Sequence, residues 1–177
     1  IGYEDAYNTF YGIYNPKGNV TITGSSRLKV YTNLTGIYAS KLTVDGCTGT
    51  IMMGSYTNCI DVHHLIVKGG TKINATCGYG GEVGDTPIYA STSINIYDTS
   101  EVYSVIERKS NTDAYRVSGI YCNGTINVYG GKLTGISYAQ GKESRTSAPA
   151  SVGIHAETLN ISGGGVVEAF IWQGSDQ

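Results

Sequence analysis

The stretch Gly119–Gly135, GIYCNGTINVYGGKLTG, contains three short apolar segments separated by two glycine-marked turns. It opens with Gly-Ile-Tyr, turns at Asn123-Gly124, alternates apolar and polar residues over 125–129, and turns again at Gly130-Gly131. Alternation with a period of two is typical of a strand with one buried face, and Asn-Gly and Gly-Gly pairs are typical of turns. The stretch therefore predicts three short strands and no helix.

The same unit recurs along the whole chain. Six copies align on an isoleucine in the first segment, and successive anchors lie 23 to 34 residues apart. These anchors are Ile13, Ile37, Ile60, Ile88, Ile120 and Ile154. A second apolar segment follows each anchor, as in Leu42-Thr43-Val44 and Leu159-Asn160-Ile161. Repetition at this period indicates stacked units, because a single unit cannot bury its apolar face alone.

Stacking would place each strand about 4.8 Å from its copy in the next unit, with parallel pairing. We therefore predict an all-β fold, a right-handed parallel β-solenoid of about six three-strand coils that forms a single domain over residues 1–177. The alternative is an antiparallel sandwich, since regularly spaced short strands with turns also suit that fold. The recurring three-part order favours the solenoid.

The predicted core consists of inward-facing apolar columns. Its members are Ile37, Val44, Ile60, Val67, Ile88, Ile96, Ile120, Val128, Ile154 and Ile161. The units lengthen after the third coil because polar segments enter at one corner, over 78–86, 107–118 and 138–152. We expect these inserted loops to project on one side, either as a binding side or simply because loops tolerate insertion.

Composition excludes several classes of function. Glycine makes up 25 of 177 residues, about double its usual share of roughly 7%, and charged residues make up only 15%. A net charge of −2 with scattered Lys and Arg lacks the basic footprint of a nucleic-acid-binding protein. No run of about 18 apolar residues predicts a membrane span. The chain opens on Ile1, so we expect a processed form or an excised module.

The four cysteines do not have the spacing of a zinc site. Cys122 falls in the column of Ala39, Ala90 and Ala156, which predicts a buried position. Cys59 and Cys77 are the pair best placed for a disulfide between coils, although the sequence leaves their redox state open.

Outward positions carry the candidate binding residues. The position after each anchor reads Tyr14, Tyr38, Asp61, Tyr89, Tyr121 and His155 down the stack. The outward position of the second strand ends in Asn95, Asn127 and Asn160, with Tyr97 and Tyr129 beside the first two. Aromatic faces and amides suit sugar rings and hydroxyls, but tyrosine also favours strands and stacks on itself between neighbours. The predicted ligand-binding residues are Tyr38, Tyr89, Tyr121, Asn95, Asn127, Tyr97 and Tyr129.

Catalytic and metal-binding patterns are not evident. The outward acids fall in different columns, whereas glycoside chemistry needs two carboxylates at a defined separation. They are Asp45, Asp61, Asp98, Glu157 and Glu168. His63-His64 has no implied Ser or Cys partner, and the acids of the inserted loops (Glu82, Asp85, Asp113, Glu143) lack calcium-loop spacing. We therefore predict no enzyme, no catalytic residue and no resident metal.

The phrase shared by GIYASKLTVDG, GIYCNGTINVYGGKLTG and GIHAETLNISGGGVVEA resembles the repeats of carbohydrate-binding parallel β-helix domains of bacterial cell-surface proteins. The resemblance covers the second, fifth and sixth coils well and the first and fourth loosely. It implies an extracellular, non-catalytic module that associates with polysaccharide. The residues themselves predict no cofactor, whereas the resemblance implies calcium as the alternative.

Two functional hypotheses follow. The first is a carbohydrate-binding or adhesion module at a bacterial cell surface that presents a Tyr/Asn face to polysaccharide. The second is a structural protein whose coils stack end to end into extracellular filaments, because the last coil carries apolar Val166-Val167 and Phe170-Ile171-Trp172.

Overall fold

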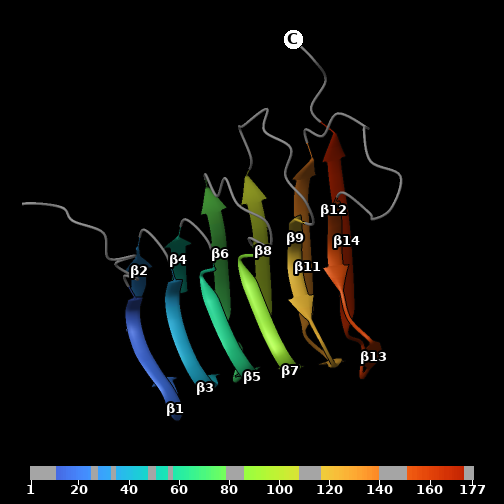
Figure 1. Cartoon of the computed structure of the whole chain (residues 1–177). Coiled ribbons are helices and arrows are strands. Elements are labelled where there is room, and N and C mark those ends of the chain that lie inside the picture. Colours follow the sequence, from blue (N-terminus) through green and yellow to red (C-terminus); the bar gives the residue numbers. More distant parts are fainter. Residues whose placement is uncertain are drawn as a thin grey trace, which may run out of the picture.

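The computed structural model describes residues 11–24, 28–32, 35–47, 51–55, 58–78, 86–107, 117–139 and 151–173. These residues form fourteen β-strands in two sheets, and no helix occurs among them (Figure 1). The prediction of an all-β fold is therefore confirmed for the described part of the chain.

The first sheet, sheet A, faces the viewer in Figure 1, and the second, sheet B, lies behind it. Sheet A contains β1 (Tyr11–Thr23), β3 (Thr35–Asp45), β5 (Ile60–Lys68), β7 (Ile88–Tyr97), β9 (Val117–Cys122), β10 (Thr125–Tyr129), β12 (Ser151–His155) and β13 (Thr158–Ser162). Sheet B contains β2 (Lys29–Tyr31), β4 (Ile51–Ser55), β6 (Lys72–Gly78), β8 (Glu101–Glu107), β11 (Lys132–Ala139) and β14 (Val166–Gln173).

Every pairing between these strands is parallel. The chain passes through sheet A, then through sheet B, and returns, so the strand order within each sheet follows the sequence. We call one such passage a repeat, and the described chain contains six. The prediction that strands of successive repeats pair in parallel is therefore confirmed, and the alternative of an antiparallel sandwich is wrong.

The division of each repeat into three strands is only partly correct. In the first four repeats the first two predicted strands are one continuous strand of sheet A, such as β3 or β7. They separate only in the fifth and sixth repeats, for example at Asn123-Gly124 between β9 and β10. A side chain on Gly124 would collide with the carbonyl oxygen of Thr92, so this turn requires glycine. The other repeats bend without interrupting the strand, with register irregularities between Asn15 and Asn19 and between Val62 and His64.

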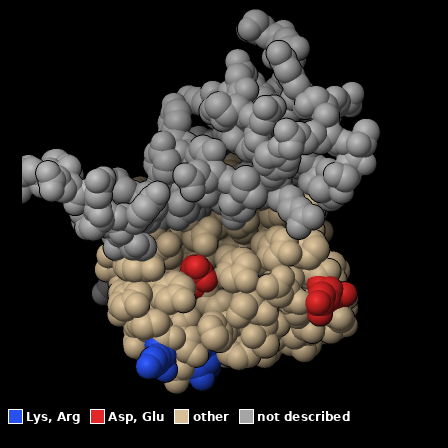
Figure 2. All heavy atoms as spheres, in the orientation of Figure 1, with Lys and Arg blue, Asp and Glu red and all other residues tan. Residues whose placement is uncertain are grey.

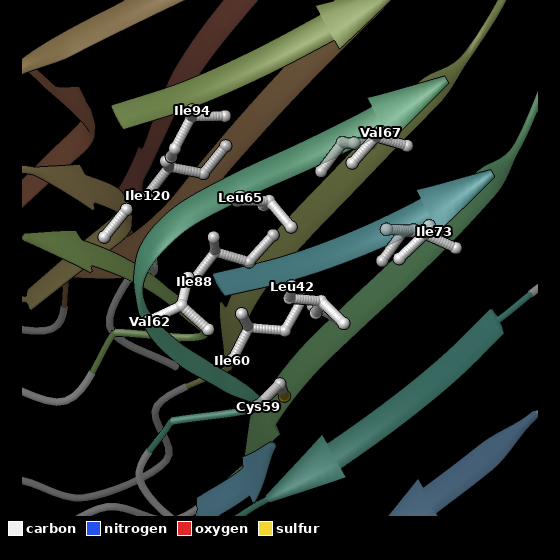
Figure 3. Close-up of a cluster of buried hydrophobic side chains, with 14 of the residues drawn as sticks. Leu42, Cys59, Ile60, Val62, Leu65, Val67, Ile73, Ile88, Ile94 and Ile120 are labelled. Carbon is white, nitrogen blue, oxygen red and sulfur yellow. The ribbon is translucent and has the colours of Figure 1, made fainter. Parts of the chain in front are cut away.

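The core lies between the two sheets, where anchor and second-segment side chains interlock (Figure 3). The predicted core is confirmed at eight positions, each with 0% exposure: Ile37, Val44, Ile60, Val67, Ile88, Ile96, Ile120 and Val128. Ile154 is only partly buried, and the prediction for Ile161 is wrong because this side chain is 50% exposed. β13 pairs with β10 on one side only, so no described strand covers the other side of Ile161.

Corners from sheet A to sheet B need a residue with positive φ, as the predicted glycine turns imply. Gly130 adopts φ 88° at the fifth corner, whereas Asp98 adopts φ 59° at the fourth. Aspartate is among the few residues other than glycine that tolerate this region. This explains why the fourth repeat lacks the glycine pair of its neighbours.

The inserted polar segments follow strands that end at one end of sheet B. β6, β8 and β11 end at Gly78, Glu107 and Ala139 (Figure 1). Residues 79–85, 108–116 and 140–150 lie outside the described residues, as do the acids Glu82, Asp85, Asp113 and Glu143. The prediction that these loops share one side therefore stays a prediction.

Candidate functional site

The predicted tyrosine row forms one column across sheet A. Strand pairing aligns Tyr14, Tyr38, Asp61, Tyr89, Tyr121 and His155. Each follows a core-facing anchor, so its side chain lies on the outer face of the sheet. Figure 2 shows that few charged side chains accompany this face of the described chain.

Rings in this tyrosine column stack on one another. The ring centroids are 5.7 Å apart for Tyr14 and Tyr38, 5.9 Å for Tyr89 and Tyr121, and 4.3 Å for Tyr121 and His155, with interplanar angles of 9° to 15°. Stacking occupies ring faces that a sugar would otherwise contact. The stacked rings therefore present mainly edges and hydroxyl groups to solvent.

The asparagine row is a hydrogen-bonded amide ladder. Asn127 Nδ2 donates to Asn95 Oδ1 at 2.8 Å, and Asn160 Nδ2 donates to Asn127 Oδ1 at 2.8 Å. Asn95 Nδ2 in turn donates to Ser93 Oγ at 3.3 Å. Each side-chain NH₂ has two hydrogens, so each amide keeps one further N–H for a ligand.

Tyr97 and Tyr129 lie beside this ladder. Their ring centroids are 5.1 Å apart at an interplanar angle of 23°. The next position in the same column is Ser162, too small to cover the second face of Tyr129, whose side chain is 40% exposed. Tyr129 is two residues from Asn127 on β10, so both side chains share the outer face. We call Asn95, Tyr97, Asn127, Tyr129 and Asn160 the amide–tyrosine surface.

The seven predicted binding residues thus form two groups. Asn95, Asn127, Tyr97 and Tyr129 lie together near the ends of β7 and β10, within the amide–tyrosine surface. Tyr38, Tyr89 and Tyr121 lie in the tyrosine column, with Tyr38 and Tyr89 near the beginnings of β3 and β7 and Tyr121 of β9 paired with Tyr89.

Two contacts on sheet A were not predicted. Asn123 Nδ2 donates a hydrogen bond to the Tyr89 hydroxyl at 3.0 Å. His64 Nδ1 lies 3.0 Å from Ser93 Oγ, so His64 does have a serine partner. The only clue in the sequence to either contact was the alignment of the repeats. This alignment brings Asn123 close to Tyr89, 34 positions earlier, and Ser93 close to His64, 29 positions earlier.

The His64–Ser93 contact lacks the third group of a nucleophilic triad. Among the described residues, no carboxylate hydrogen-bonds to His64, and Ser93 also accepts the hydrogen bond from Asn95. Catalysis through an activated serine requires a base that is itself oriented by a third group. The contact is therefore explained as a polar pair between adjacent strands.

Asp61 interrupts the tyrosine column between Tyr38 and Tyr89. The carboxyl group is partly buried, and Asn58 Nδ2 donates to Oδ2 at 3.4 Å. Burial raises the pKa of Asp61, while the hydrogen bond from Asn58 and the charge of His63 act in the opposite direction. This is the one acidic position in a column that is otherwise aromatic.

The structure also locates the cysteines. Cys122 is fully buried, as predicted. Cys59 Sγ and Cys77 Sγ lie 3.8 Å apart in the core, well beyond the length of about 2.05 Å of a disulfide bond. The two thiols predicted to pair are therefore in contact, without a bond between them in this structure.

Within the described ranges, no group of three or more His, Cys, Asp or Glu side chains is arranged to hold a metal ion. The described part of the chain also contains no helix long and apolar enough to cross a membrane. Comparison with known proteins adds no assignment: no family model, curated protein or solved structure matches this chain.

Proposed function

We propose that this chain is a right-handed parallel β-solenoid of about six coils that acts as a non-catalytic, extracellular polysaccharide-binding module of a bacterial cell surface. The parallel register of the six repeats supports the architecture. The resemblance of the repeat phrase to carbohydrate-binding β-helix domains supports the ligand class and the location.

The observation that carries this proposal is the exposed ring of Tyr129 beside a ladder of amides. One face of Tyr129 stacks on Tyr97, and the next residue of the column on the other side is the small Ser162. An aromatic face packs against the apolar C–H face of a sugar ring, and amide groups donate to and accept from sugar hydroxyls. Asn127 and Asn160 place such amides next to Tyr129.

The repeated geometry favours a polymer over a single sugar. Equivalent amides recur at each strand spacing of about 4.8 Å, so a sugar chain that follows the stack meets the same groups several times. Several weak contacts on one polymer combine into useful avidity. The low charge of the face agrees with a neutral or weakly charged polysaccharide (Figure 2).

The test is affinity electrophoresis of the purified protein in gels that contain neutral and acidic polysaccharides. We expect at least one polysaccharide to retard the wild-type protein and the Tyr129→Ala change to abolish this retardation. Tyr103→Ala is the matched control, because Tyr103 is also 40% exposed but lies on sheet B. Absence of retardation across the panel, or equal loss in both variants, would contradict the proposal.

A second candidate function is end-to-end assembly of copies into extracellular filaments. The sixth repeat exposes large apolar side chains that continue the core columns: Leu159, Ile161, Phe170 and Ile171. Among the described strands, none pairs with the outer edge of β13 or β14. Free edges of this kind are templates for further strands.

The two terminal repeats also complement each other in chemistry. The column that ends with Glu168 begins with the exposed Lys29 in the first repeat. Likewise, the column that ends with Ile161 begins with Ile22. A second copy in the same register would pair opposite charges and apolar side chains, and such head-to-tail contacts propagate.

Sedimentation velocity over a range of concentrations tests this assembly. We expect wild type to form larger species as concentration rises and Ile161→Lys to remain monomeric. Tyr103→Lys, which adds the same charge at the side of the stack, should assemble like wild type. A wild-type protein that stays monomeric at high concentration would rule out the filament function and leave polysaccharide binding unaffected.

A further inference from the structure

The tyrosine column contains one gap, at Asp61. Asp61 pairs with Tyr38 on one neighbouring strand and with Tyr89 on the other. A short carboxyl side chain at this position leaves the space that a third ring would occupy. The gap is therefore bordered by a tyrosine on each side and has a carboxyl group at its base.

Each bordering ring turns one face toward this gap. Tyr38 stacks with Tyr14 on its far side, and Tyr89 stacks with Tyr121 on its far side. Because both stacks are close to parallel, the opposite faces of Tyr38 and Tyr89 look toward each other across Asp61. The rings are two strand spacings apart, about 9.6 Å. A group midway between them lies about 4.8 Å from each ring, within the limit of about 6 Å for a cation–π contact.

Among the described residues the carboxyl group at the base belongs to no ion pair, and the one cationic group that favours its ionised form is His63. The one hydrogen bond that the described residues give this carboxyl group comes from the neutral amide of Asn58, at 3.4 Å. Burial is the largest cause of the raised pKa of Tyr89 and of Tyr11, and the negative charge of Asp61 raises both pKa values further. A partly buried carboxylate that forms no ion pair is costly, and a cationic ligand in contact with it would offset that cost.

We propose that this gap is a binding site for an alkylammonium group held between Tyr38 and Tyr89 above the Asp61 carboxylate. Ring faces carry negative electrostatic potential, and the carboxylate adds a full negative charge. All three groups therefore favour a cation, and a quaternary or primary ammonium group has the apolar surface that ring faces accept. An anion would meet repulsion, and a neutral group would leave the carboxylate without an ion pair.

The site is separate from the amide–tyrosine surface, which lies near the ends of the strands. Ammonium binding and polysaccharide binding can therefore fail independently. The ammonium group can come from a small molecule that contains a quaternary ammonium, or from an amino sugar with an unacetylated amine. The shared chemistry is the alkylammonium cation, and the probes below separate these two sources.

The test is isothermal titration of the protein with choline and with 3,3-dimethylbutan-1-ol, its uncharged analogue of the same shape. We expect saturable binding of choline at one site, at least about tenfold tighter than that of the neutral alcohol. Chitosan and chitin oligosaccharides form the second pair of probes. If the protein binds choline and chitosan oligosaccharides but not chitin oligosaccharides, the ligand class includes amino sugars. If it binds choline and neither oligosaccharide, the ligand class is restricted to quaternary ammonium compounds.

Three variants locate the site. Asp61→Asn keeps the shape of the side chain and removes its charge, and we expect choline binding to fall about tenfold or more. Tyr89→Leu removes one ring face and should also weaken binding. Glu157→Gln removes an exposed acid elsewhere on the same side and should bind choline like wild type. Equal binding of choline and its neutral analogue, equal affinity of wild type and Asp61→Asn, or no saturable binding would overturn the proposal.

Discussion

Substitution of Ile120 by alanine tests the stacking of the repeats. Ile120 is fully buried and pairs with Ile88 on one side and Ile154 on the other. Its neighbours belong to strands fixed in both sheets and cannot readily collapse into the space. Removing a fully buried isoleucine side chain down to its Cβ typically costs about 2–5 kcal/mol. For a chain of this size, a loss of about 3 kcal/mol lowers the melting temperature by roughly 6–12 °C.

The matched control is Ile161→Ala. Ile161 is 50% exposed on the last repeat, so its truncation removes only about half of the transfer energy and leaves no closed cavity. We expect a loss of about 1 kcal/mol or less. Circular dichroism during heating and urea unfolding measures both variants. Equal destabilisation by the two changes, or a loss below about 1 kcal/mol for Ile120→Ala, would refute the inferred packing.

Three further predictions concern polar and sulfur contacts. Burial raises the pKa of Asp61 above its ordinary 3.8, so its charged form destabilises the fold. Asp61→Asn should therefore melt higher than wild type near pH 7, and the difference should disappear below about pH 3.8. Asn127→Ala breaks the middle of the amide ladder and should cost about 1–2 kcal/mol in urea unfolding, whereas an unchanged midpoint would contradict the ladder. Oxidised glutathione should join Cys59 and Cys77 in a disulfide by taking two electrons and two protons from the thiols. The mass of the protein should fall by about 2 Da, and its free energy of unfolding should rise by roughly 3 kcal/mol. Cys77→Ser should prevent both effects.

Much of the fold was predictable because the repeats share one chemistry. The anchors from Ile13 to Ile154 align in the structure as the recurring phrase predicted, since strands of the same pattern bury the same face. Whether the first two segments of a repeat form one continuous strand or two was not predictable, because the sequence does not show whether a bend interrupts hydrogen bonding. The exposure of Ile161 depends on a neighbouring strand, and its own repeat looks like the others.

The candidate site was predictable as a set of columns, but its geometry was not. Sequence spacing placed Asn95 with Asn127 and Tyr97 with Tyr129, and the structure brings both pairs together. Ring orientation decides whether a tyrosine offers its face or its edge, and this follows from the neighbours across strands. The gap at Asp61 could not be identified as a candidate site from the sequence, because it depends on Tyr38 and Tyr89 each stacking on the ring at their far side.

The amide–tyrosine surface is the proposed polysaccharide-binding site. Its most direct test is amide chemical-shift mapping by NMR, with an oligosaccharide from whichever polysaccharide retards the protein. We expect the perturbed amides to cluster on β7, β10 and β13, around Asn95, Asn127, Tyr129 and Asn160. Perturbations centred on sheet B around Tyr103, or none at saturating oligosaccharide, would contradict it.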